Sequence, residues 1–200
     1  MVSHLWFALV ICLAQWRGVA CTLTLDQYHT AALHGKPASS GTVDNLDFNL
    51  DFTGSAEITG MLALTESLYS FDCTFTGGQL VFVWVGDHLV CHTDPPFGNA
   101  QSSTDGCPEN PLPGNSTMSI VIHIYSASAD GSGNVTSDST ARVNVQWAAQ
   151  QAPLPMGAHP SYVSVPSSAL SPESSNAEIQ RRTLQKSLQN GWNTWYSLWC

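Results

Sequence analysis

The sequence has 200 residues, of which 43% are hydrophobic and 10% charged, so it is not a disordered acidic chain and can form one ordinary domain with appendages. Six Lys and Arg residues stand against fifteen Asp and Glu residues, giving a formal net charge of −9. A net acidic surface argues against nucleic acid and anionic membrane surfaces as partners.

The first twenty residues carry the features of a secretory signal peptide. The run from Leu5 to Ala14, LWFALVICLA, is apolar but too short to span a bilayer. Gly18 and Ala20 are small residues suited to a cleavage site before Cys21. We therefore expect residues 1–20 to be removed and the protein to be secreted; the alternative is a buried apolar N-terminal strand. No later segment has the roughly 18 apolar residues of a membrane span, so we expect no transmembrane span.

Alternation of apolar and polar residues predicts a series of strands between residue 21 and about residue 170. The clearest segment, LDFNLDF at 46–52, places its Leu and Phe side chains on one face and its Asp and Asn side chains on the other. Gly86-Asp87 predicts a tight hairpin turn. Strands are expected over residues 46–52, 57–64, 68–75, 80–85, 88–91, 118–125, 141–147 and 163–165.

The character of the sequence changes after this region. Residues 153–175 are rich in Pro and Ser and read as a domain edge and linker. Ser175 and Glu178 form a capping-box pattern, and Leu184 and Leu188 share one side of a helix expected over residues 176–190. The tail, GWNTWYSLWC, carries three of the seven tryptophans. We expect residues 173–200 to be a linker, a helix and the start of a truncated C-terminal domain.

Many short strands with Gly, Pro, Asn and Asp between them are typical of an antiparallel sandwich or barrel. The predicted fold is all-β: an antiparallel, jelly-roll-like β-sandwich over residues 21–172, with a short C-terminal helix.

The cysteines that follow the predicted signal peptide are disulfide candidates in an oxidising compartment. There is no CxxC pair and no His/Cys cluster at zinc spacing, so we expect no metal site. Spacing does not determine the connectivity; the preferred bridge is Cys91–Cys107, which would close a polar, turn-rich loop. There are five such cysteines, an odd number, so one thiol stays free or pairs outside the chain. The candidates are Cys21, Cys73, Cys91, Cys107 and Cys200.

Two sequons agree with secretion and predict a glycoprotein. They are Asn115-Ser116-Thr117 and Asn134-Val135-Thr136, both among loop-forming residues.

Residues 46–91 resemble the protective-antigen-type β-sandwich, a lectin-like module of toxins, adhesins and glycosidases, and the stretch LYSFDCTFTGGQLVFVWVGDHLV within them carries the likeness. The segments VNVQW and VPSSAL resemble its closing strands, so the likeness covers about residues 25–172. In sugar-binding members two adjacent turn aspartates hold a calcium ion, whereas this chain has Thr76-Gly77-Gly78. The resemblance leaves calcium open, but its paired ligands are absent and we expect no cofactor.

A polar rim for sugar is still expected beside that region, at Asp87, His88, His92 and Asp94. The alternative is that these four are solvent-facing turn residues. The tail segment LQKSLQNGWNTW is similar to the opening of the catalytic domain of secreted glycosidases related to mannosylglycerate hydrolase and processing α-glucosidase. That resemblance implies a sandwich that precedes an α/α toroid, in which Trp192 and Trp195 stack on sugar or pack between domains.

Catalysis by this chain alone is not expected. No GxSxG elbow, HExxH motif or P-loop occurs. Asp47 and Asp51 lie on one strand face about 13 Å apart by strand rise, which exceeds the roughly 5–10 Å that glycoside hydrolysis needs. Glu57 has no partner that the sequence reveals, and His123 is better explained as a satisfied or surface histidine than as a general base.

Three functions remain open. The first is a secreted, carbohydrate-associated accessory module of a glycoside hydrolase, whose partner is carbohydrate or a catalytic domain. The second is a stand-alone carbohydrate-binding or adhesion module. The third is a structural extracellular interaction domain.

Overall fold

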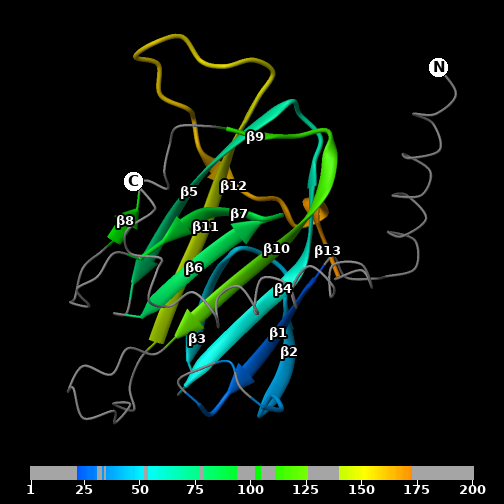
Figure 1. The fold of residues 1–200 in the computed structure, drawn as a ribbon, viewed down its shortest axis with the longest axis vertical. Coiled ribbons are helices and arrows are strands. Elements are labelled where there is room, and N and C mark those ends of the chain that lie inside the picture. Colours follow the sequence, from blue (N-terminus) through cyan, green and yellow to red (C-terminus); the bar gives the residue numbers. More distant parts are fainter. Residues whose placement is uncertain are drawn as a thin grey trace, which may run out of the picture.

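The computed structural model describes residues 22–30, 33, 35–51, 54–76, 79–93, 102–104, 111–125 and 140–172. The period-two segments form strands at each predicted place (Figure 1). Two further strands near the N-terminus, and short strands that pair with longer ones, were not predicted individually. The predicted helix at 176–190 lies outside the described residues. The elements are β1 (Leu23–Tyr28), β2 (Ser39–Val43), β3 (Asp47–Asp51), β4 (Ser55–Leu64), β5 (Leu68–Thr76), β6 (Leu80–Val85), β7 (His88–His92), β8 (Ser102–Thr104), β9 (Leu112–Pro113), β10 (Ser116–Tyr125), β11 (Thr140–Gln150), β12 (Val163–Ser164), the 3₁₀ turn η1 (Ser167–Ala169) and β13 (Leu170–Ser171).

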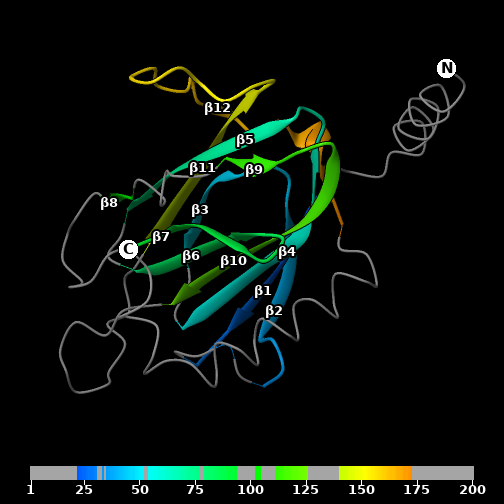
Figure 2. The ribbon, with the colours of Figure 1, turned by 45° about the horizontal axis from the view of Figure 1, so that its top comes forward.

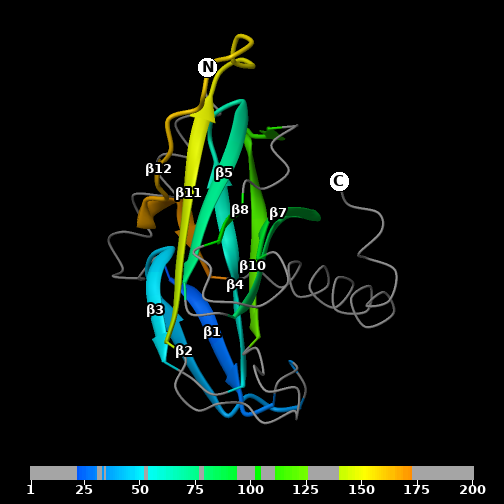
Figure 3. The same cartoon turned by 90° about the vertical axis from the view of Figure 1, so that its left-hand side faces the viewer.

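The strands form two antiparallel sheets that face each other (Figures 2 and 3). The seven-stranded sheet has the order β2-β1-β4-β10-β6-β7, and β13 adds to β4 beyond the end of β1. The six-stranded sheet has the order β12-β11-β5-β8, with β3 beside β11 and β9 beside β5. The all-β sandwich is therefore confirmed.

The core lies between the two inner faces. Strand alternation puts every second side chain there, because successive side chains point to opposite sides of a sheet. The predicted inner faces of β3, β5 and β11 are confirmed: their apolar alternates are buried or pack against the buried cluster. The largest fully buried apolar side chains include Tyr69, Leu23, Leu46, Ile58, Leu62, Leu64, Ile120, Ile122 and Ile124.

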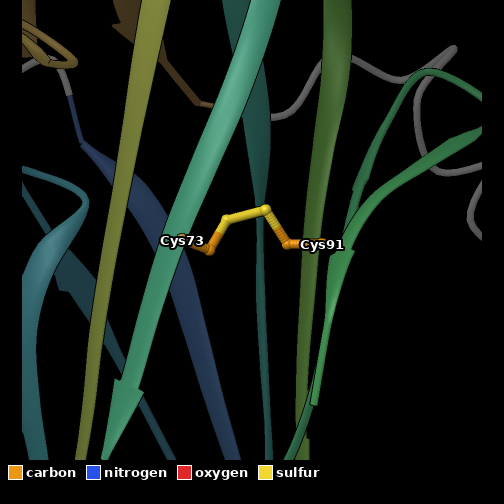
Figure 4. Close-up of a disulfide and its surroundings, with 2 residues drawn as sticks. All are labelled: Cys73 and Cys91. Atoms are coloured by element: carbon orange, nitrogen blue, oxygen red, sulfur yellow. A yellow bond between two sulfur atoms is a disulfide. The ribbon is translucent and has the colours of Figure 1, made fainter. Parts of the chain in front are cut away.

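A disulfide joins the two sheets across this core. Cys73 of β5 and Cys91 of β7 are bonded, and both are fully buried (Figure 4). The predicted Cys91–Cys107 bridge is wrong, because Cys91 is already paired; Cys107 itself lies outside the described residues. The physical reason is a β-bulge: Val83 pairs with Cys91 but Trp84 pairs with Leu89, so Val90 is the extra residue and Cys91 turns inward.

Candidate functional site

The β6–β7 hairpin carries the first residues of the predicted sugar rim. Gly86 has φ 63°, which the first central position of a two-residue type II′ turn requires. Asp87 and His88 follow at the tip, with 89% and 52% of their side chains exposed. Asp87 Oδ1 lies 3.2 Å from His88 Nε2. The hairpin thus presents a carboxylate and an imidazole side by side to solvent.

His92 does not join this pair. It lies at the other end of β7, opposite Phe82, and is half-buried with Nδ1 3.4 Å from the carbonyl oxygen of Thr93. Four residues of strand separate it from His88, on the order of 13 Å. The other predicted rim residues, Asp94, Trp192 and Trp195, lie outside the described residues. Among the residues that the structure describes, no group of three or more His, Cys, Asp or Glu side chains could hold a metal ion.

A second polar cluster, which the sequence did not reveal, lies on the outer face of the seven-stranded sheet, the face turned away from the six-stranded sheet. Glu57 of β4 is directly opposite His123 of β10, and His123 is opposite Phe82 of β6. These three alternate with core residues, so their side chains point outward. Glu57 and His123 are nevertheless only 1% exposed.

Glu57, His123 and Tyr125 form a hydrogen-bonded chain. His123 Nε2 lies 3.0 Å from Glu57 Oε1, and Tyr125 Oη lies 3.3 Å from His123 Nδ1. In the Nε2–H tautomer the imidazole donates to the carboxylate and accepts from the phenol, so both ring nitrogens are used. This confirms the interpretation of His123 as a satisfied histidine, and it gives Glu57 the partner that the sequence did not reveal.

Aromatic rings surround this hydrogen-bonded network of side chains. The indole of Trp84 meets His123 edge-on, with ring centroids 4.9 Å apart. Phe82 stacks on Trp84 at 5.6 Å and meets Tyr125 edge-on at 6.2 Å. Such contacts stabilise beyond simple area burial and fix the orientation of the imidazole. We call Glu57, Phe82, Trp84, His123 and Tyr125 the outer-face cluster.

The electrostatics of the outer-face cluster favour a structural network over catalysis. Burial, and secondarily the negative charge of Glu57, raise the pKa of the Tyr125 phenol above its ordinary value. A phenol held in its protonated form donates a hydrogen bond and is a poor nucleophile or base. In this arrangement Tyr125 therefore orients His123.

The raised pKa predicts an alkaline instability that Tyr125→Phe removes. Below about pH 10, the ordinary tyrosine pKa, the phenol is protonated in both the folded and the unfolded chain, so its contribution to the free energy of unfolding does not change with pH. Above that pH the unfolded chain ionises first, and the free energy of unfolding falls by about 1.4 kcal/mol per pH unit. Urea unfolding between pH 8 and pH 11, roughly spanning that ordinary pKa, should show a steeper decline for the wild type than for Tyr125→Phe. Equal slopes of unfolding free energy against pH for the two proteins would contradict the raised pKa of Tyr125.

The described sequon lies in an accessible turn. Asn115 has φ 55°, and its backbone N–H donates to the carbonyl of Glu66 at 2.9 Å between β9 and β10. Asn115, Ser116 and Thr117 are all exposed. This position suits a glycan, whereas Asn134 lies outside the described residues. In the part of the chain that the structure describes, no helix is long and apolar enough to cross a membrane.

Comparisons with known proteins bear on the fold. No family model matches the chain, and no curated protein matches it. Among solved structures, an anti-sigma factor domain-containing protein is similar over 76% of this chain, with 19% identity and a TM-score of 0.51. This chain covers 47% of that one, so it spans about half its length.

Two shorter solved domains are also similar. The PA14 domain of the antifreeze protein MpAFP matches over 77% of this chain and 92% of its own, with 12% identity and a TM-score of 0.49. The PA14 sugar-binding domain from an RTX adhesin matches over 75% of this chain and 97% of its own, with 13% identity and a TM-score of 0.48. At 19% identity, the likeness to the anti-sigma factor domain-containing protein is one of fold.

Proposed function

We propose that this chain is a secreted, carbohydrate-associated accessory module of a glycoside hydrolase, non-catalytic by itself. The observation that carries the proposal is the exposed Asp87–His88 pair at the tip of a tight hairpin on a two-sheet sandwich. A carboxylate accepts and an imidazole donates hydrogen bonds, and neighbouring sugar hydroxyls offer the complementary groups. The sequence resemblance to lectin-like sandwiches and to a glycosidase opening segment supports the same assignment.

The placement of the described carboxylates supports a non-catalytic role. Hydrolysis of a glycoside needs two carboxyl groups about 5–10 Å apart across an accessible cleft. Asp47 Oδ1 lies 3.3 Å from Arg142 Nη2, and Asp51 Oδ1 accepts a hydrogen bond from the Thr140 hydroxyl at 2.6 Å. Glu57 is enclosed with His123 on the outer face. The carboxylates of these three residues therefore contact other side chains of the sandwich.

A glycan-array measurement on the secreted chain tests this proposal, with and without a chelator. The double variant Asp87→Ala/His88→Ala is expected to lose about tenfold or more in affinity, because roughly 1.4 kcal/mol of lost hydrogen bonding corresponds to tenfold. The matched control is Asp47→Ala/Arg142→Ala, which removes another exposed ion pair, 3.3 Å long, from the six-stranded sheet.

The outcomes separate the candidate functions. Binding that the hairpin variant loses and the control keeps supports a sugar site at Asp87 and His88. Loss on chelation adds a calcium requirement to that site. Absence of binding to every glycan contradicts the proposal and favours a structural interaction domain.

A further inference from the structure

The outer face of the seven-stranded sheet is buried, although the second layer of the sandwich lies on its other side. Glu57 and His123 are 1% exposed, Thr59 2% and Trp84 3%. The six-stranded sheet packs on the inner face, and no other strand among the described residues covers the outer face (Figure 3). Half-solvated faces of antiparallel sheets normally carry exposed polar residues, so this face is built to be covered.

The chain leaves the described sandwich beside this face. Strand β13 pairs Leu170 with Leu62 and Ser171 with Met61 of β4, and Pro172 is the last described residue. Met61, Thr59 and Glu57 are the successive outward-pointing residues of β4. Residues 173–200, which is 28 residues (200 − 172), therefore begin one strand spacing from the buried face.

The composition of that segment complements the face. Arg181, Leu184 and Leu188 have the i, i+3, i+7 spacing of one helical side, and the three Trp residues follow. Arg181 puts a positive charge on this helical side, whereas Arg182 and Lys186 fall outside it.

The face has the opposite charge. Asp26 of β1 lies opposite Glu57, so two carboxylates are neighbours on it. Lys36 and Arg142 are the described Lys and Arg residues, and neither lies in a strand of the seven-stranded sheet.

The length of the expected helix also agrees with the width of the buried face. The helix expected over residues 176–190 would be about 22 Å long. Strands β1, β4, β10 and β6 are adjacent, and at a spacing of about 4.8 Å they are roughly 14 Å wide. One such helix therefore crosses the whole buried area.

We propose that residues 173–200 dock on the outer face of the seven-stranded sheet of the same chain. Leu184 and Leu188 pack over Val121 and Trp84, and Arg181 approaches Asp26 and Glu57. Docking of residues 173–200 does not depend on carbohydrate binding, so an experiment can disprove either one without the other.

Photo-crosslinking of the full chain tests the docking directly. Benzoylphenylalanine at Leu184 is expected to link, within one monomer, to the peptide that holds Met61 or to the peptide that holds Trp84. The matched control places it at Lys186, on the opposite side of the expected helix, where no such link should form. Links that join two chains would mean that a second copy covers the face, and equal or absent links from both positions would also overturn the proposal.

Hydroxyl-radical footprinting provides a second measurement that does not depend on the linker. In Leu184→Asp/Leu188→Asp, oxidation of Trp84 and Tyr125 is expected to rise severalfold, while the core residue Tyr69 stays protected and reports an intact fold. The control Lys186→Asp/Gln189→Asp adds two aspartates to the other helical side and should keep the wild-type pattern. Unchanged protection of Trp84 in the leucine variant would overturn the docking.

Discussion

His123→Ala is expected to lower the free energy of unfolding by about 3 kcal/mol or more, because it leaves the buried Glu57 carboxylate without its hydrogen-bond donor. His123 Nε2 lies 3.0 Å from Glu57 Oε1, and both side chains are 1% exposed. Without the imidazole, the Glu57 carboxylate loses this hydrogen bond in a site that water does not reach. Trp84 also loses the ring against which it packs at 4.9 Å. Urea unfolding followed by tryptophan fluorescence measures the change.

The control for this experiment is His88→Ala. His88 also lies beside a carboxylate, that of Asp87 at 3.2 Å, but both side chains are largely exposed. An exposed pair contributes at most about 1 kcal/mol, so the two histidine variants should differ by several-fold in effect. In the His123→Ala background, Glu57→Gln should recover part of the loss, because a neutral amide costs less to bury than a carboxylate. Equal, small effects of His88→Ala and His123→Ala would show that the buried network does not stabilise the fold.

Cys73→Ala/Cys91→Ala is expected to cost about 3 kcal/mol of unfolding free energy. The bridge closes a segment with a sequence separation of 18, and in the chain-entropy model a loop of this size restricts the unfolded chain by roughly that amount. Because the bond joins the edge strand β7 to the opposite sheet, its loss should also loosen the β6–β7 hairpin. Thermal or urea unfolding of the variant and the oxidised wild type measures the difference.

Reduced wild type provides the control, since it should unfold at nearly the same urea concentration as the double variant. Peptide mapping without reductant should recover the peptides of Cys73 and Cys91 linked together. A linked Cys91–Cys107 peptide pair would contradict the connectivity.

The sequence by itself determined eight of the strands and, for β3, β5 and β11, the side that faces the core. Alternation is a local property, and burial enforces it, because a shift of one residue would move every apolar side chain to the wrong face. The segment LDFNLDF and the Tyr69, Phe71, Cys73, Phe75 series therefore predicted β3 and β5 correctly. The Gly86-Asp87 hairpin was equally readable, since the turn conformation depends on the glycine itself.

Only the tertiary structure decided which distant residues meet. Glu57 and His123 are 66 residues apart, and the β4–β10 register that places them opposite each other follows from packing of the whole sheet. Cys91 pairs with Cys73 because a bulge at Val90 turns it toward the core, and local alternation gives no sign of that extra residue. Side-chain direction is fixed by neighbours along the strand, whereas partners are fixed by register and bulges set across strands.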